Sequence, residues 1–134
     1  MTVDKVSARW VSDQVFLLRD HFDFPVVMTQ PMGANGADLL PLSLIGCAAW
    51  DVLSILKKQR QQVTQMEVSA ESGRDDEPPW RFRYIRILYR IHGHNLDLER
   101  VRRAIDLAET KYCSVYVTLK AAVDLQSTFE VING

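Results

Sequence analysis

The sequence predicts an α+β fold with the element order βββ-α-ββ-α-α-β. Alternating polar and apolar residues near both ends of the chain are typical of half-buried strands. A long apolar segment in the middle, and a later segment with apolar residues at helical spacing, indicate helices. Because the chain has 134 residues and no internal repeats, we expect one domain that covers residues 1–134.

Three short strands are predicted before the long apolar segment. The segments KVSARWV, QVFLL and FPVVMT are rich in alternating or β-branched residues, and polar breaks separate them. We place antiparallel strands at residues 3–11, 14–20 and 24–29. The following segment, QPMGANGA, contains a proline and two glycines and therefore predicts a loop.

The long apolar segment predicts a helix over residues 39–61. Asp38 is suited to cap its first turn, and Pro41 is tolerated in that turn because its missing N–H would have no partner there. The first half of the helix is apolar on all sides, so it must be covered on every side. One small sheet covers one side only. A second copy of the chain is therefore expected to cover the other, which predicts an obligate homodimer.

A β-hairpin is predicted after this helix, with strands at residues 63–72 and 80–93 joined by the polar turn GRDDEPP. A second helix over residues 97–112 has apolar residues at helical spacing on one face. These residues are Val101, Ala104, Ile105, Ala108 and Tyr112. A short helix over residues 114–123, capped by Ser114, and a strand near 127–132 complete the order.

Composition excludes several classes of protein. The net charge of −1 argues against nucleic acid as a partner, since phosphate binding requires a basic excess. The first ten residues lack the apolar core of a signal peptide, so we expect a cytoplasmic protein. The nearly apolar run 39–50 is too short to cross a bilayer, which predicts no membrane partner. Four arginines, at positions 81, 83, 86 and 90, are interpreted as the solvent-exposed face of a strand.

Aromatic residues are interpreted as core residues, and an apolar pocket near a dimer interface is the alternative. They are Trp10, Trp50, Trp80, Phe82 and Tyr84. His92 and His94 share one side of an extended segment, and a cysteine could join them at a metal. Zinc prefers four ligands, however, and local spacing indicates no fourth. We therefore expect no metal and no cofactor.

The two cysteines, Cys47 and Cys113, are the candidates for chemistry. A cysteine in an apolar helix is usually a small hydrophobe, so a packing role is the alternative to a reactive thiol. A structural disulfide is not expected in the cytosol, where thiols are kept reduced, so any pairing would be transient. Asp51 follows Cys47 by one helical turn on the same face, where its charge would raise the pKa of the thiol.

The loop GANGADLL, the helix LSLIGCAAWDVLSILKK and the later segment AETKYCSVYVTLKAAV together resemble the OsmC/Ohr family of thiol-dependent, peroxide-detoxifying proteins. The resemblance covers nearly the whole chain and is nearer to the uncharacterised OsmC-like branch than to the organic hydroperoxide resistance proteins. It implies an intertwined homodimer in which antiparallel sheets wrap around buried central helices, with active sites at the subunit interface.

The resemblance also implies roles for individual residues. Cys47 would attack an organic hydroperoxide and become a sulfenic acid, and Cys113 would resolve it to a disulfide. A thiol or dithiol, such as a protein-bound lipoyl group, would reduce the disulfide. In the family a carboxylate at the head of the helix holds an arginine that stabilises the thiolate, and Asp38 stands at that place. Arg9, Arg19 or an arginine of the partner subunit are the candidates for the cation.

Two functions therefore remain open from the sequence. The first is an enzyme, a thiol peroxidase of oxidative stress defence. The second is a non-catalytic dimer that binds a small apolar ligand at its interface and keeps its cysteines reduced. No motif in the sequence secures the activating arginine, which counts against the enzyme. The distances between the two sulfurs and the nearest guanidinium group would distinguish the two functions.

Overall fold

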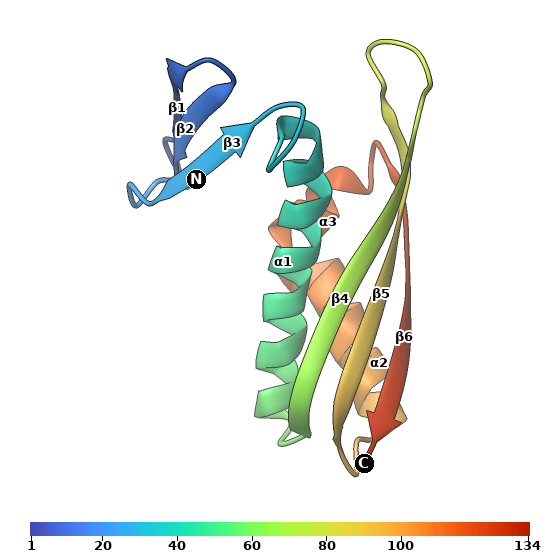
Figure 1. Ribbon diagram of the computed structural model, residues 1–134. Coiled ribbons are helices and arrows are strands. Elements are labelled where there is room, and N and C mark those ends of the chain that lie inside the picture. The colour runs from blue at the N-terminus through green and yellow to red at the C-terminus, as the bar shows by residue number, and fades with distance from the viewer. The chain divides into compact units, whose positions relative to one another are not determined.

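The computed structural model describes residues 1–134, shown in Figure 1. The predicted element order is confirmed, and the family resemblance to an α+β fold holds. Two compact units make up the chain, Met1–Leu40 and Pro41–Gly134. The elements are β1 (Ser7–Ser12), β2 (Val15–Arg19), β3 (Pro25–Thr29), α1 (Gly36–Lys58), β4 (Gln62–Arg74), β5 (Phe82–His94), α2 (Leu98–Leu107), the π-helical turn η1 (Ala108–Tyr112), α3 (Ser114–Leu119) and β6 (Asp124–Asn133).

The first unit contains a three-stranded antiparallel sheet in the order β1-β2-β3. β1 begins at Ser7, four residues later than the sequence predicts, because its partner β2 ends at Arg19, which pairs with Ser7. The loop after β3 brings Gly33 back against Thr29 with a φ of +98°. Glycine suits this position because an L side chain rarely adopts that backbone conformation and a Cβ would collide with the threonine side chain.

Helix α1 begins three residues earlier than predicted, and its cap is different. The side chain of Asn35 accepts a hydrogen bond from the backbone N–H of Asp38 at 3.0 Å, so Asn35 is the N-cap. The Asp38 carboxylate instead accepts a hydrogen bond from the Asn35 amide at 3.2 Å. Pro41 consequently lies within the helix rather than in its first turn. Asp38, the cap that the sequence predicts, lies three residues after Asn35, inside the helix.

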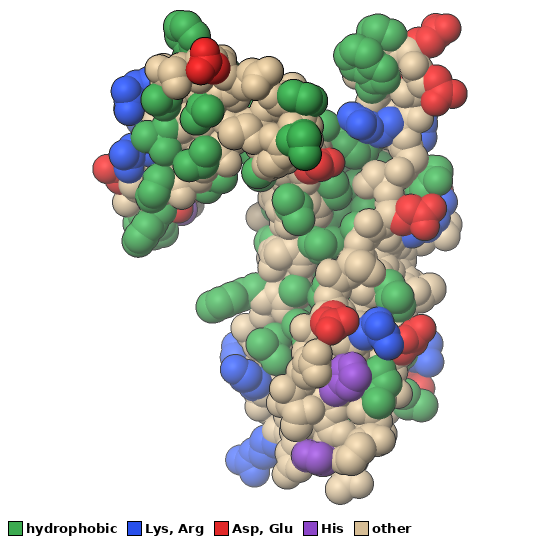
Figure 2. All heavy atoms as spheres, viewed as in Figure 1, with side chains coloured by type: hydrophobic (Ala, Val, Ile, Leu, Met, Phe, Trp, Pro, Cys, Tyr) green, Lys and Arg blue, Asp and Glu red, His purple; other side chains and the backbone are tan.

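One stripe of α1 is buried, and much of the remaining surface is not. Leu44, Ala48, Val52 and Leu56 are fully buried at four-residue spacing. Leu42 and Trp50 are 51% and 76% exposed. Figure 2 shows hydrophobic side chains at the surface of this helix. By length and composition α1 is apolar enough to cross a membrane, a test that the core helix of a soluble protein also passes.

The second unit contains the sheet β4-β5-β6 with β5 in the centre. β4 and β5 form the predicted antiparallel hairpin. β6 pairs with β5 in parallel, which corrects the expectation of antiparallel sheets only. The physical reason is the connection: the chain crosses over through α2, η1 and α3 before β6 begins, and such a crossover returns a strand in the parallel direction.

The core of the second unit lies between this sheet and the helices. β5 alternates strictly, and its buried side chains belong to Ile85, Ile87, Tyr89 and Ile91. They meet the buried stripe of α1 and the apolar face of α2, which contributes Val101, Ala104 and Ile105. In Figure 1 the helices cover one face of the sheet. The thiols of this protein are therefore held on elements that a shared core makes rigid.

Aromatic side chains depart from their predicted places. Trp10, Trp50 and Trp80 are 62%, 76% and 52% exposed, so the interpretation of these tryptophans as core residues is wrong. Their positions fall on a strand of the first unit, on the uncovered side of α1 and in the β4–β5 turn. The arginines on β5 do lie outside the core. Arg83, Arg86 and Arg90 form ion pairs with Asp75, Asp124 and Glu130 respectively.

Candidate functional site

Cys47 lies on α1 directly before Ala48 of the buried stripe, and it is half-buried. Three residues earlier, Leu44 anchors the same face in the core, so the thiol is carried at the margin between core and surface. Helical geometry places Asp51 one turn further along the same face, as its spacing predicts. The sequence identified this pair correctly because both residues belong to one regular helix.

Cys113 is buried in the core, at a position that regular α-helical spacing does not predict. The end of α2 widens into the π-helical turn η1, in which the N–H of Cys113 donates to the carbonyl of Ala108 at 2.7 Å. This i→i+5 bond puts Cys113, rather than Tyr112, beneath Ala108. Tyr112 is 54% exposed and Cys113 is fully buried, so the predicted place of Tyr112 on the apolar face is wrong. Single π-turns of this kind are frequent at functional sites.

The sulfur of Cys113 also caps the short helix α3. It accepts a hydrogen bond from the N–H of Tyr116 at 3.4 Å, so Cys113 and not Ser114 is the N-cap. Burial, and to a smaller extent a hydrogen bond with Cys47, raise the pKa of the Cys113 thiol to about 11. The N–H of Tyr116 acts in the opposite direction. At neutral pH Cys113 therefore keeps its proton.

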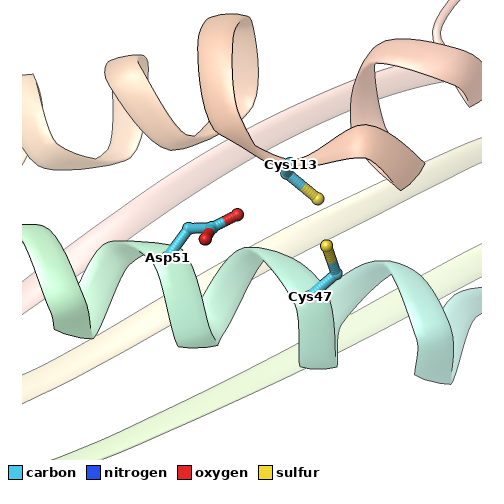
Figure 3. Close-up of side chains that lie close together, drawn as sticks. All are labelled: Cys47, Asp51 and Cys113. Atoms are coloured by element: carbon cyan, nitrogen blue, oxygen red, sulfur yellow. The ribbon is translucent and has the colours of Figure 1, made fainter. Parts of the chain in front are cut away.

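The tertiary structure brings together Cys47, Asp51 and Cys113. Their sulfur and carboxylate oxygen atoms all lie within 4.8 Å of one another, and both cysteines are free thiols. Figure 3 shows the two sulfurs pointing toward each other across the gap between α1 and the segment after η1, with the Asp51 side chain extending toward that segment. Residues 66 positions apart in the chain thus form one site.

Asp51 links this site to a cavity of about 220 Å³. Burial raises the pKa of the Asp51 carboxyl. The cavity has apolar walls from both α1 and the end of α2, with one cation on α1. Its lining residues are Asp51, Ser54, Ile55, Lys58, Leu107 and Tyr112.

A buried carboxyl group supports the turn that carries Cys113. Glu109 is 8% exposed and accepts hydrogen bonds at 2.9 Å from Tyr89 of β5 and Ser127 of β6. Burial raises the pKa of Glu109 despite both hydrogen bonds. Sequence reasoning missed this residue. The available signal was its place beside Ala108, at the edge of the apolar face of α2.

The remaining predicted site residues do not belong to this cluster. Asp38, Arg9 and Arg19 lie in the first unit, in which Arg19 forms an ion pair with Asp23 at 3.7 Å. His92 and His94 lie on β5 and are absent from the cluster. The cluster itself offers two sulfurs and one carboxylate oxygen, and these are donors that zinc accepts. Three ligands leave the preferred set of four incomplete.

Chemically, the arrangement suits thiol–disulfide chemistry. Two free sulfurs face each other, one of them half-buried and the other fully buried, beside a carboxyl group and a cavity. A small movement of either segment would bring the sulfurs to bonding distance, which for a disulfide is about 2.05 Å.

This fold and this thiol pair define an OsmC-like protein. The chain belongs to that family, because the family model described as OsmC-like protein matches residues 29–128. Protein YhfA of Escherichia coli strain K12 is 35% identical to this chain over 127 residues, which cover 92% of the chain and 95% of YhfA.

Solved structures share the architecture. The crystal structure of a hypothetical protein from Aquifex aeolicus VF5 matches with a TM-score of 0.90 and 28% identity, over 100% of this chain and 99% of that one. The organic hydroperoxide resistance protein OhrB of Bacillus subtilis matches with a TM-score of 0.62, over 96% of this chain and 98% of that one. At 16% identity, this second likeness shows the fold alone.

Proposed function

We propose that this protein is a thiol-dependent peroxidase that reduces organic hydroperoxides in oxidative stress defence. The observation that carries the proposal is the approach of Cys47 and Cys113 to within 4.8 Å as free thiols. One of the structures that share this fold is named an organic hydroperoxide resistance protein, which supports organic hydroperoxides as the substrate class.

Cys47 is the attacking residue and Cys113 the resolving one. The half-buried Cys47 is accessible to a peroxide, whereas Cys113 is fully buried. The Cys47 thiolate attacks one oxygen of the O–O bond, the alcohol leaves, and a sulfenic acid remains. The sulfur of Cys113 then displaces the hydroxyl group to form the disulfide. A thiol or dithiol reductant restores both thiols, and no cofactor takes part.

An activating arginine completes the proposed mechanism. A thiolate needs a cation or hydrogen-bond donors to form at neutral pH. We assign this role to Arg9, Arg19 or an arginine of the partner subunit, oriented by Asp38. Replacing Arg9 and Arg19 singly with glutamine distinguishes them, since only the activating residue slows the oxidation of Cys47.

The functional form is an intertwined cytoplasmic homodimer in which residues 1–134 of each copy make one domain. The exposed apolar side of α1 supports this assembly, because a stable monomer rarely leaves such a surface uncovered.

Intact-mass spectrometry after brief exposure to cumene hydroperoxide tests the proposal. The reduced wild type is expected to lose two hydrogens as the disulfide forms. Cys113→Ser should stop at a sulfenic acid with one added oxygen, and Cys47→Ser should stay unmodified. An unmodified wild type, or the same oxidation in Cys47→Ser, would refute the peroxidase. In that case, the dimer that binds an apolar ligand becomes the better interpretation.

A further inference from the structure

Asp51 stands beside both sulfurs without a partner of its own. Its carboxylate lies within 4.8 Å of the sulfurs of Cys47 and Cys113, and Figure 3 shows it extending from α1 toward the segment that carries Cys113. None of the side-chain ion pairs or hydrogen bonds in the structure engages it, and burial is the cause of its raised pKa. An untethered carboxyl group at a thiol pair is free to exchange a proton with it.

The buried thiol needs such a group. Cys113 is fully buried, with a pKa near 11, so at neutral pH it is a thiol and not a thiolate. Only the thiolate is an effective nucleophile, so Cys113 must lose its proton before or while it attacks Cys47. A carboxyl group whose pKa is raised toward the operating pH is a better general base than an ordinary one.

We propose that Asp51 is a catalytic acid–base residue for disulfide formation between Cys47 and Cys113, and this role rests on the proposed function. The carboxylate takes the proton of Cys113 as its sulfur attacks the sulfur of the Cys47 sulfenic acid. The S–S bond forms while the S–O bond breaks, and Asp51 gives the proton to the departing hydroxide. The products are the disulfide and one water, so Asp51 ends in its starting state.

The surroundings allow this role. Two other charged or titratable residues line the cavity beside Asp51. They are Lys58, a cation on α1, and Tyr112 of η1. The two thiols face Asp51 across the cluster. The cavity connects the carboxyl group to solvent, so water can leave there. Because the Asp51 carboxylate lies within 4.8 Å of the sulfur of Cys113, it is placed to act in the second step, in which that sulfur attacks.

Rapid-quench mass spectrometry separates the two steps. Asp51→Asn should still form the sulfenic acid, but convert it to the disulfide roughly a hundredfold more slowly, the lower end of the range for general acid–base catalysis. In wild type the rate of this conversion should rise with pH through the pKa of Asp51, and Asp51→Asn should lack that rise. Asp106→Asn, an exposed carboxyl group on α2, is the matched control. A wild-type rate and pH profile in Asp51→Asn would overturn the proposal.

A second measurement needs no peroxide. An aromatic disulfide reagent that releases thionitrobenzoate reacts first with the more exposed Cys47, and Cys113 then displaces the second thionitrobenzoate. We expect Asp51→Asn to slow this displacement by a similar factor and Asp51→Glu to restore part of it. If wild type ignores hydroperoxide yet shows this dependence, the peroxidase fails and the role of Asp51 stands. If Asp51→Asn displaces at the wild-type rate, the role of Asp51 fails whatever the substrate.

Discussion

At the scale of single residues, burial is the main influence on ionisation around the thiol pair. Glu109, Cys113 and Asp51 each have a raised pKa, and in each case burial is the largest cause. Neutral forms are therefore favoured around the thiol pair. A site that holds protons in this way requires a specific group to move them, which is why the position of one carboxyl group matters.

Glu109→Gln tests whether burial raises the pKa of the Glu109 carboxyl group. Because the folded state raises the pKa of Glu109 above 4.5, its contribution to stability is complete below that pH and is lost as the pH rises through the folded value. Glutamine cannot ionise and retains partners in Tyr89 and Ser127. The variant should therefore gain stability relative to wild type as the pH rises above 4.5, measured as free energies of unfolding in urea.

Glu71→Gln, at an exposed position of β4, controls for the amide substitution itself. Tyr89→Phe provides an independent check at a fixed pH. It leaves one oxygen of the buried carboxyl without its donor and should cost about 1–3 kcal/mol. A constant difference between Glu109→Gln and wild type across the pH range would contradict the assignment.

At the scale of elements, the ends of helices depend on which side chain reaches the free N–H groups. Asn35 caps α1, and Cys113 caps α3, although Asp38 and Ser114 were the predicted caps. In both cases the predicted residue lies inside the helix. Polar residues close to a helix start are therefore good signals of its position, within about a turn, and poor signals of the cap itself.

Asn35→Ala should lower the free energy of unfolding by about 1 kcal/mol, because it removes the acceptor for the N–H of Asp38. Asn35→Asp keeps an acceptor and serves as the control. Urea denaturation at one fixed protein concentration measures both, since stability of an oligomer depends on concentration. An Asn35→Ala protein as stable as wild type would show that another group caps this helix.

At the scale of the whole molecule, the main feature is the exposed apolar side of α1. Trp50, 76% exposed on α1, is a large aromatic residue of the kind that anchors interfaces. We expect sedimentation to show a dimer at micromolar concentration. Trp50→Arg should weaken the dimer by roughly tenfold or more, since loss of an aromatic anchor typically costs 2 kcal/mol or more.

Trp80→Arg is the matched control for this prediction. Trp80 is 52% exposed, but it lies in the β4–β5 turn rather than on α1. Its replacement should leave the dimer intact. A compact, folded wild-type monomer at micromolar concentration would refute the assembly, and equal weakening by both substitutions would show that α1 is not the contact.

The sequence by itself determined the features that depend on neighbours along the chain. Strand alternation predicted the hairpin of β4 and β5, and helical spacing placed Asp51 on the face of Cys47. Those patterns repeat with the period of the local backbone, so they can be read without knowledge of the fold.

Only the tertiary structure decided the features that depend on distant contacts. The parallel direction of β6, the exposure of Trp50 and the approach of Cys113 to Cys47 were not readable from local patterns. The π-turn η1 shifts the helical phase by one residue, which buries Cys113 and exposes Tyr112. Burial against the sheet and α1 selects that phase, because the packed core accepts the small thiol where helical spacing would have placed a tyrosine ring.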